Sequence, residues 1–305
     1  MIGDRVRTSA YDDAIRQVVR PGDVVLDFGC GLGILAMMAA RAGARKVYAV
    51  DRLSIVRVAQ AIAKKNGLSR IDFVFAPEGG FDLPEKVDVV VSEWMGHFAV
   101  HEGMIGPLCA ARDKHLREGG RMLPERVTMR ASLVTSRSAH DERALFQRPV
   151  HGFDFAPVSE WSFGEVAGVR FRAEDLLGPG VEVARLEMAS VRGMPRAVAG
   201  EIVPDRAEEV FGIAGWFDAD LASGVRFGTG PDAEETHWTP LYFPFATPMK
   251  VAANRPVRLR LSPVQIDVVH TRWHWWAGDG VEERSGDDMT LMAYLRRPLA
   301  AGVLK

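Results

Sequence analysis

Residues 24–35 read VVLDFGCGLGIL and carry the strongest fold signal in the chain. The apolar run at 24–28 predicts a short buried strand. Residues 34–42 are rich in Ala, Leu and Met, with no helix breaker before Gly43, and predict a helix. Glycines between the strand and the helix let the backbone approach a ligand while helix N–H groups point at it. These glycines are Gly29, Gly31 and Gly33.

Two acidic residues indicate which nucleotide this turn would bind. Asp27 closes the first strand, where the dinucleotide fingerprint normally has no acid, and Ile34 replaces the third glycine of that fingerprint. An acid at this place suits a ligand with an ammonium group, such as the methionine part of S-adenosylmethionine. Asp51 closes the second expected strand and is placed to accept hydrogen bonds from both ribose hydroxyls. We therefore expect S-adenosylmethionine, and a turn with only a structural role is the alternative.

The other residues up to position 123 alternate between strand and helix patterns. Strand-like runs lie at 46–50, 71–75 and 87–92, and helical patterns lie at 55–63 and 102–116. Such alternation predicts βαβ units around a parallel sheet. We expect a Rossmann-like α/β domain over residues 1–123.

The pattern changes near Leu123-Pro124. Beyond it, β-type runs at 127–134, 210–216 and 257–261 are separated by Gly and Pro, and six of the seven tryptophans follow position 150. A chain of 305 residues is long enough for two domains. We expect a β-rich second domain over residues 124–305.

The composition excludes several classes of protein. With 38 basic and 40 acidic side chains the net charge is −2, so no strong overall field attracts nucleic acid or anionic lipid. Cys30 and Cys109 are too few for a disulfide scaffold or a cysteine-based metal site. No apolar run approaches the ~18 residues of a membrane span, and the first residues lack the order of a signal peptide. We expect a soluble, cytoplasmic protein without a metal, a membrane or a nucleic acid as partner.

A second group of polar residues lies in the stretch 92–102, which reads SEWMGHFAVHE. Glu93 and Glu102 stand on either side of a glycine-containing loop at the carboxyl end of an expected strand. Ligands of open α/β sheets bind at that edge. Glutamate is rarely fully buried without a partner, so two glutamates in an apolar stretch favour a guanidinium or ammonium guest. An exposed surface loop is the other interpretation.

Several segments together, in their order along the chain, resemble the protein arginine methyltransferase family. They are VLDxGxGxGIL from Val25, AGARKV from Ala42, VDxxxSEWMG from Val87, ARDK from Ala111 and THW from Thr236. The resemblance is close over residues 6–127 and returns over 227–245. It implies a Rossmann-like domain that binds S-adenosylmethionine, followed by a β-barrel. A barrel insertion, the dimerisation arm, docks on a partner subunit in that family.

The resemblance also implies roles for single residues. Asp27, Gly29, Gly31 and Gly33 match the cofactor loop, and Asp51 stands where the family usually has a glutamate for the ribose. Glu93 and Glu102 match the paired carboxylates that bind the acceptor. His237-Trp238 matches a loop that closes the reaction chamber, although a lone His beside a Trp is more often structural. Met104 matches a methionine that shapes the reaction chamber, and Arg7 matches an arginine that contacts the cofactor carboxylate. Asp4 matches an aspartate that is hydrogen-bonded to the histidine of that loop.

The chain departs from the family pattern at several places. His97 and His101 stand where many members have tyrosines, and His97 is expected to contact the acceptor. Glu78 is the expected adenine-binding acid, with an offset of one residue. Residues 146–169 occupy the place of the arm with little sequence match, but Phe153, Phe155, Trp161 and Phe163 are apolar groups that need cover, either by a homodimer partner or by their own barrel.

The resemblance predicts transfer of a methyl group from S-adenosylmethionine to a guanidine nitrogen of protein arginine. Free arginine or another small guanidine metabolite is the alternative acceptor. A nicotinamide dehydrogenase is disfavoured by Asp27 and Ile34, and a non-catalytic binding module by the two glutamates. The number and symmetry of the methyl groups stay open.

The amino terminus matches the middle of the helix that the family folds over cofactor and acceptor. We expect either further residues rich in Tyr or Phe upstream of Met1, or a mobile segment 1–10 and slow turnover.

Overall fold

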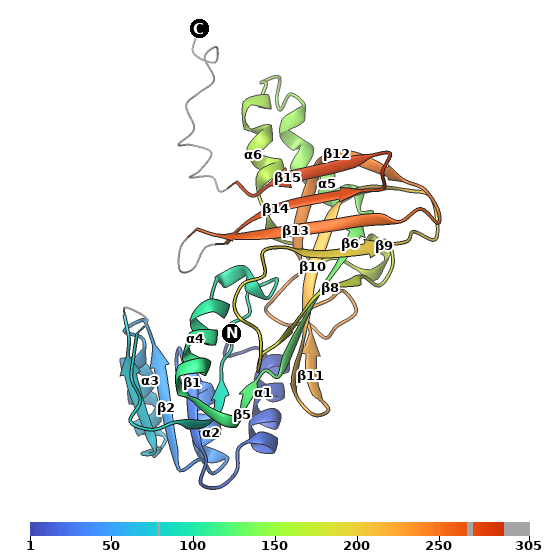
Figure 1. Ribbon diagram of the computed structural model, residues 1–305. Coiled ribbons are helices and arrows are strands. Elements are labelled where there is room, and N and C mark those ends of the chain that lie inside the picture. The colour runs from blue at the N-terminus through green and yellow to red at the C-terminus, as the bar shows by residue number, and fades with distance from the viewer. Residues whose placement is uncertain (78–79, 267–270, 290–305) are drawn as a thin grey trace. The chain divides into compact units, whose positions relative to one another are not determined.

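The computed structural model describes residues 1–77, 80–266 and 271–289 of this chain (Figure 1). Contacts between residues divide it into two compact units. The first unit contains residues 1–129, 185–194 and 217–238, and the second contains the rest of the described chain. The first unit therefore includes both the cofactor-type turn and the segment with His237-Trp238.

The sheet of the first unit is parallel and has the order β3-β2-β1-β4-β5. Its strands are β1 (Val24–Phe28), β2 (Lys46–Asp51), β3 (Ile71–Phe75), β4 (Val87–Val91) and β5 (Leu116–Leu123). All five residues of β1 are buried, as the continuous apolar run predicted. The order reverses between β1 and β4, and open α/β sheets bind ligands at such a switch point.

Four α-helices belong to this unit: α1 (Arg5–Val18), α2 (Ile34–Arg41), α3 (Val56–Lys65) and α4 (Ile105–His115). Right-handed crossovers place α2 and α3 on one face of the sheet and α4 on the other. The apolar pattern did not predict helix α1, because the first residue of its buried stripe is Arg7, and only the resemblance to the family implied a helix at the amino terminus. That stripe continues at Tyr11, Ala14, Ile15 and Val18 with helical spacing.

The helix predicted at 102–116 is wrong at both ends. Residues Val100–Glu102 form the 3-10 helix η1, Gly103 follows in a left-handed conformation, and α4 begins only at Ile105. Leu116 already belongs to β5, a strand that was not predicted. Val87 pairs with Leu116 and Val89 with Arg121, so β5 contains a bulge that includes Gly119 and Gly120. In the sequence the two glycines follow the predicted helix, and in the structure they form part of this bulge.

Two further sheets contain antiparallel strand pairs. One has the order β7-β12-β10-β6-β8 with β11 beside β10, and the other has the order β15-β14-β13-β9. The strands of the first are β6 (Arg126–Val134), β7 (Ala167–Gly168), β8 (Val181–Glu187), β10 (Glu208–Ala222), β11 (Val225–Gly228) and β12 (Leu241–Val251). Those of the second are β9 (Val198–Ile202), β13 (Val257–Gln265), β14 (Thr271–Gly278) and β15 (Glu283–Asp287). The β-type runs predicted after position 124 all lie in these strands.

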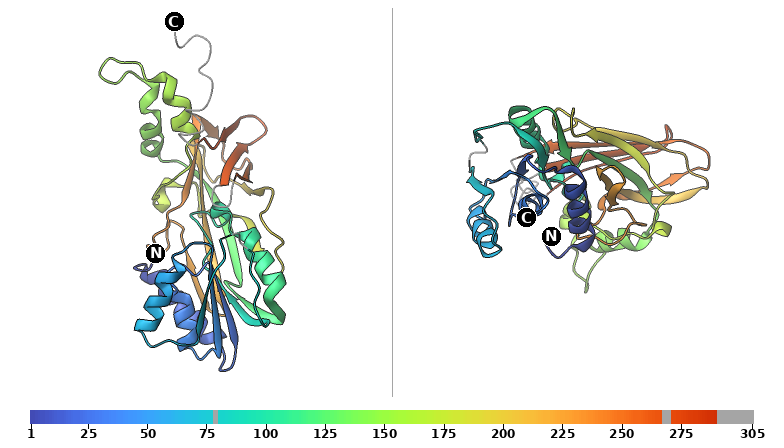
Figure 2. Two further views of the ribbon diagram at one scale, coloured as in Figure 1. Left: turned by 90° about the vertical axis from the view of Figure 1, so that its left-hand side faces the viewer. Right: turned by 90° about the horizontal axis from the view of Figure 1, so that it is seen from below.

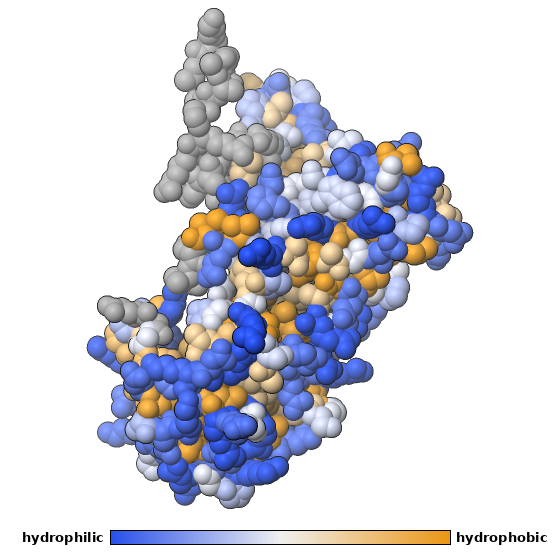
Figure 3. All heavy atoms as spheres, viewed as in Figure 1, coloured by the Kyte–Doolittle hydropathy of each residue, from blue (hydrophilic) through white to orange (hydrophobic). Residues whose placement is uncertain are grey.

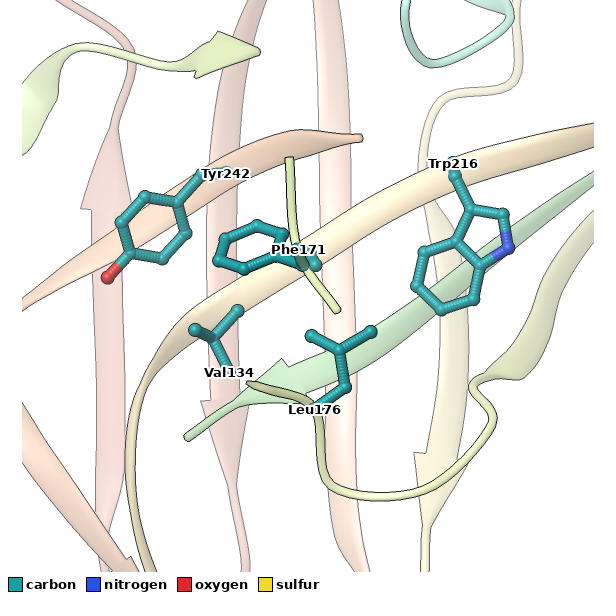
Figure 4. Packing of buried hydrophobic residues seen from close by; sticks show 6 residues of the cluster. Val134, Phe171, Leu176, Trp216 and Tyr242 are labelled. Atoms are coloured by element: carbon teal, nitrogen blue, oxygen red, sulfur yellow. The ribbon is translucent and has the colours of Figure 1, made fainter. Parts of the chain in front are cut away.

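Aromatic side chains fill the space between strands of the second unit. Phe243 of β12 packs against Trp273 and Trp275 of β14, with ring centroids 5.5 and 5.7 Å apart. The indole N–H of Trp275 donates to the carbonyl oxygen of Pro244 at 3.0 Å. A neighbouring cluster joins Trp216, Phe171 and other buried residues, with Phe171 edge-on to Tyr242 at 5.5 Å (Figure 4).

The segment expected to be an arm contains short helices. These are α5 (Arg137–Arg143), η2 (Ala144–Gln147), η3 (Ala156–Val158) and α6 (Ser159–Gly164), with η4 (Ala173–Asp175) beyond them. Figures 1 and 2 show α5 and α6 together, projecting beyond the strands of the second unit. Phe163 is buried and its ring lies 5.2 Å from that of His140. Phe153 and Phe155 are 70% and 40% exposed, so only part of this apolar surface is covered by the chain itself.

Hydrophilic side chains cover most of the first unit on the face shown in Figure 3, and apolar groups form separate patches there. Within the described residues, none of the helices has the length and apolar character that crossing a membrane requires.

Gly180 provides a stability test of the aromatic cluster. A Cβ atom on Gly180 would lie 2.4 Å from the Trp216 ring, whereas one on Gly178 would have open space, and both glycines have a positive φ. Gly180→Ala should therefore lower the free energy of unfolding by about 1–3 kcal/mol more than Gly178→Ala, since only the former overpacks the core. Denaturant titration of both variants measures the difference. Equal losses would show that Trp216 moves aside without cost.

Candidate active site

The glycine turn after β1 is fastened to the end of β2. The backbone N–H groups of Gly29 and Cys30 both donate to the carbonyl oxygen of Val50, at 2.9 and 3.0 Å. Gly33 has φ +80°, and a Cβ there would lie 3.2 Å from the Cβ of Ala59. Only glycine adopts this positive φ easily and also leaves room for the side chain of Ala59. The backbone of the turn can therefore lie close to α3.

Asp51 holds the same turn from the end of β2. Its Oδ2 accepts a hydrogen bond from the N–H of Gly31 at 2.8 Å, and its Oδ1 accepts one from Leu53 at 2.8 Å. Each carboxylate oxygen has a second lone pair, so both can still accept a hydroxyl. The structure therefore brings the predicted ribose acid and the predicted cofactor loop together.

Asp27 is fully buried beneath this turn. Its Oδ2 accepts the N–H of Ala36 in α2 at 2.8 Å, and its Oδ1 has no partner among the described residues. Burial raises the pKa of Asp27 to about 7. The hydrogen bond from Ala36 lowers this pKa, and the negative charge of Asp51 raises it further. In this structure Asp27 orients the first turn of α2.

Asp4 joins two segments that are distant in the sequence. Its Oδ1 caps α1 by accepting the N–H of Arg7 at 3.0 Å. Its Oδ2 accepts the backbone N–H of His237 at 2.9 Å and lies 2.7 Å from Nδ1 of the same histidine. Burial opposes ionisation, but the bonds from His237 and Arg7 hold the pKa of Asp4 below its usual value.

The hydrogen bonds between Asp4 and His237 hold the segment with His237 and Trp238 in place. Burial lowers the pKa of His237, and the bond to Asp4 opposes that shift. A neutral ring that donates from Nδ1 to Asp4 keeps Nε2 as an acceptor. The ring of His237 lies 4.0 Å from that of Trp238, which stacks on Phe227 at 5.7 Å.

Glu93 is buried against the guanidinium of Arg7. Nη1 of Arg7 lies 3.3 Å from Oε2 of Glu93, and the two side chains are only 3% and 6% exposed. Oε1 of Glu93 accepts the N–H of Met95 at 3.1 Å. Burial raises the pKa of Glu93 to about 7. The positive charge of Arg7 lowers this pKa, and the negative charge of Glu102 raises it. The electrostatic effect of Glu102 indicates that the two carboxylates share one region.

The loop between the glutamates folds back on itself at Gly96. The N–H of Gly96 donates to the carbonyl oxygen of Ala99 at 3.2 Å, and Ala99 has φ 48°. A Cβ on Gly96 would lie 2.9 Å from Cγ of Glu102, so the loop backbone touches that side chain. Burial of its carboxyl raises the pKa of Glu102 although the residue as a whole is exposed, and the charge of His97 opposes the shift.

Met104 connects this loop with the glycine turn, since a Cβ on Gly29 would lie 3.3 Å from the methyl carbon of Met104. Apart from Glu78, which lies outside the described residues, every predicted site residue belongs to the first unit. No group of three or more His, Cys, Asp or Glu residues that could hold a metal occurs in the described part of the chain.

Two buried residues of this region were missed from the sequence. The hydroxyl of Tyr11 donates to the carbonyl oxygen of Ser92 at 3.0 Å. The hydroxyl of Ser92 donates to the carbonyl oxygen of Phe28 at 2.6 Å. They tie α1 to the ends of β4 and β1. Tyr11 follows Arg7 by four residues, so the helical spacing on α1 was the signal that could have found it.

The chain is similar to known methyltransferases in sequence and in structure. A family model described as ribosomal protein L11 methyltransferase matches residues 7–102. "Protein arginine N-methyltransferase 1" of Schizosaccharomyces pombe is 34% identical over 269 residues, which are 85% of this chain and 78% of the relative. The protein of the same name from Saccharomyces cerevisiae is 32% identical over 80% of this chain and 74% of its own length.

The chain belongs to the protein arginine N-methyltransferase family. A solved Trypanosoma brucei structure, described as a PRMT1 enzyme-prozyme heterotetrameric complex with AdoHcy, matches at TM-score 0.84 and 25% identity. The match covers 95% of this chain and 96% of that one. Arabidopsis thaliana protein arginine methyltransferase 10 shows the same fold at TM-score 0.77 and 24% identity, over 95% of this chain and 96% of that one.

Family membership confirms several predictions. They are the Rossmann-like domain followed by an antiparallel β domain, the enzyme class of S-adenosylmethionine-dependent methyltransferases, and S-adenosylmethionine itself. The residues present fit this cofactor, because Asp51 keeps free lone pairs beside the glycine turn and Nε of Arg7 is buried without a partner among the described residues.

Asp51→Ala tests the ribose assignment. The variant loses an acceptor for ribose hydroxyls and the bond that holds Gly31, so affinity for S-adenosylmethionine should fall roughly ten- to a hundredfold. Isothermal calorimetry measures it, with Asp72→Ala on the neighbouring strand as the control that keeps its affinity. An unchanged dissociation constant for Asp51→Ala would remove Asp51 from the cofactor site.

Proposed function

We propose that this protein transfers a methyl group from S-adenosylmethionine to a guanidine nitrogen of arginine residues in proteins. The names of the relatives favour a protein acceptor over free arginine or a small guanidine metabolite. The observation that carries the proposal is the buried contact between Arg7 and Glu93 at 3.3 Å. In this contact the carboxylate of Glu93 already pairs with a guanidinium, that of Arg7, so the site can stabilise the kind of group that the acceptor carries.

In this proposal the two glutamates clamp the guanidinium of the acceptor. A free guanidinium has a pKa near 13.8, so its prior deprotonation at pH 7 would cost about 9 kcal/mol. Glu93 and Glu102 instead draw positive charge toward two of the nitrogens, and the third regains lone-pair character. They also align that nitrogen for in-line attack. Bound S-adenosylmethionine supplies an electrophilic methyl group on a sulfonium.

The cofactor side of the site follows from the groups around the glycine turn. Gly29, Gly31 and Gly33 bring the backbone to the ligand, and Asp51 accepts from the ribose. Arg7 has spare N–H donors for the cofactor carboxylate, and the charge of buried Asp27 favours the ammonium end. Met104 lines the chamber beside the turn, and Glu78 stays a prediction for the adenine.

His237 and Trp238 form the third wall in this proposal, and His97 contacts the acceptor. The bond to Asp4 fixes the orientation of the His237 ring, and Trp238 is anchored by Phe227. Nε2 of His237 can then accept a hydrogen bond or a proton at the acceptor.

The acceptor class is tested with labelled S-adenosylmethionine and a panel of arginine peptides, free arginine and guanidine metabolites. We expect label in peptides, with methylarginine after hydrolysis. Label only in free arginine or in a metabolite would overturn the protein substrate, and label in no acceptor would overturn the activity.

Glu93→Gln and Glu102→Gln should each lower kcat at least a hundredfold on the best acceptor, because an amide cannot offset the guanidinium charge. Affinity for S-adenosylmethionine should stay within a few-fold of the wild-type value. Glu118→Gln changes an exposed glutamate on β5 and serves as the control. Wild-type turnover in either active-site variant would exclude that glutamate from the clamp.

The raised pKa of Glu93 predicts how activity depends on pH. Below about pH 7 the carboxyl is protonated and cannot pair with a cation, so kcat/KM should rise as the pH increases through 7. The charged groups that act on Glu93 are Arg7, Glu102 and the amino-terminal ammonium. A kcat/KM that is flat between pH 5.5 and 8 would contradict the predicted ionisation.

We also propose a homodimer, through the exposed apolar groups of residues 146–169. Phe153, Phe155 and the nearby Leu145 are 70%, 40% and 42% exposed. A second copy can cover them. Light scattering should give twice the 33.5 kDa of one chain, and Phe153→Asp should shift the mass toward one chain. A fully active monomer of wild type at micromolar concentration would contradict the dimer.

A cytoplasmic location is our proposal for the compartment. Cys30 and Cys109 are both free and buried, which suits a reducing environment. Cell fractionation with an antibody against the chain tests it, and recovery from an oxidising compartment would contradict it.

A further inference from the structure

The pairing of β1 with β4 ends just before the candidate active site. Its last paired residues are Asp27 and Val91. Phe28 and Ser92 follow them, and a side chain links these two residues: the hydroxyl of Ser92 donates to the carbonyl oxygen of Phe28 at 2.6 Å. The two strand ends therefore stay connected at the switch point, where open α/β sheets bind their ligands.

This linked pair stands between the two halves of the proposed site. Phe28 directly precedes the glycine turn that would hold the methyl donor, and Ser92 directly precedes Glu93, which would hold the acceptor. Ser92 is fully buried, so bulk water does not compete for its hydroxyl. One hydrogen bond thus connects the backbone of the donor side with the backbone of the acceptor side.

Tyr11 of α1 holds Ser92 from another direction. Tyr11 is fully buried, and its hydroxyl donates to the carbonyl oxygen of Ser92 at 3.0 Å. The backbone N–H of Ser92 donates to the carbonyl oxygen of Leu123 at 3.0 Å. The ring of Tyr11 lies 6.4 Å from that of Phe227, on which Trp238 stacks. Ser92 is therefore restrained at its N–H, at its carbonyl and at its hydroxyl, and it passes that restraint to the next residue.

Methyl transfer depends strongly on the distance and direction between the two substrates. In an in-line displacement the attacking nitrogen must lie behind the methyl carbon, opposite the sulfur, and a misplacement of about 1 Å can cost about a hundredfold in rate. The glycine turn follows β1 and Glu93 follows β4, so the gap between these strand ends sets the distance between donor and acceptor. The hydroxyl of Ser92 spans that gap.

We propose that Ser92 and Tyr11 are positioning residues for methyl transfer: their hydrogen bonds fix the distance between the turn that holds the donor and the carboxylate that holds the acceptor. This inference rests on the proposed function. Neither side chain contacts the reacting atoms in this proposal. Loss of either hydroxyl should therefore slow the transfer step and leave the binding of each substrate nearly unchanged.

The chain offers a matched control for each residue. Ser132 is fully buried and donates its hydroxyl to the carbonyl oxygen of Leu177 at 3.1 Å. Tyr242 is fully buried and donates its hydroxyl to the carbonyl oxygen of Phe211 at 2.9 Å. All four residues belong to the second unit. Ser132→Ala and Tyr242→Phe therefore remove the same kinds of hydrogen bond outside the unit that contains the proposed site.

The test is single-turnover methylation of the arginine peptide that wild type methylates best. Ser92→Ala should lower the rate at least about tenfold and Tyr11→Phe about threefold to tenfold. The dissociation constants of S-adenosylmethionine and of the peptide should stay within about threefold of the wild-type values. The double variant should be within about twofold of Ser92→Ala, because both hydroxyls act through one residue. Ser132→Ala and Tyr242→Phe should keep the wild-type rate.

Three results would overturn the positioning role. They are wild-type rates in both Ser92→Ala and Tyr11→Phe, an equal loss of rate in the two controls, and a loss confined to the dissociation constants.

Failure of the proposed function gives a different result. If wild type methylates only free arginine or a guanidine metabolite, the protein acceptor is wrong, and the same comparison is made on that acceptor. If wild type methylates nothing, the methyltransferase activity is wrong. Crystal structures then decide the positioning: Ser92→Ala must move Glu93 relative to Gly29 by more than the coordinate error, and coincident structures would overturn it.

Discussion

The buried carboxylate of Glu93 is the constraint on which the site depends. A carboxylate with 6% of its side chain exposed loses most of its hydration, and a second carboxylate nearby makes the charge still less favourable. Such a group is either protonated or paired with a cation. In this chain the cation is the guanidinium of Arg7, so the protein keeps a place in which a guanidinium is already stabilised.

The first turn of α1 organises much of this arrangement. Asp4 caps the helix through Arg7, and the same carboxylate holds His237. Arg7 points from the same turn to Glu93, and Tyr11, one turn further along, donates a hydrogen bond to the carbonyl oxygen of Ser92. A single helical stripe thus contacts the THW segment, the glutamate loop and the sheet. A substitution in the first turn of α1 would therefore change the contacts of the THW segment, the glutamate loop and the sheet.

Local signals in the sequence predicted most of the elements. The strands at 24–28 and 71–75 were found with their observed bounds. The first is a buried parallel strand, which leaves a continuous apolar run, whereas the second is mostly apolar although only Ile71 is buried. The apolar pattern missed helix α1 because a charged residue begins the buried stripe of that helix. It missed β5 because that strand begins directly after the predicted helix and contains two glycines. These misses have one cause, since pattern rules assume that polar groups and glycines lie outside buried elements.

The candidate site was only partly predictable. Spacing placed Glu93 and Glu102 on one loop, and the resemblance to the family suggested that Asp4 meets His237. The bond from Arg7 to Glu93 spans 86 positions and depends on how α1 lies on the sheet. The contact of Gly96 with Glu102 depends on the tight loop around Ala99. Neither follows from residue types and spacing, because both result from tertiary packing.

The most direct measurement of this account is a ¹³C titration of the Glu93 carboxyl, without and with a saturating arginine peptide. The account predicts a pKa of about 7 in the free protein. It also predicts a clear fall on binding, because a second guanidinium favours the carboxylate. An ordinary glutamate pKa in the free protein, or a pKa that the peptide leaves unchanged, would contradict the claim that Glu93 is a buried receptor for a guanidinium.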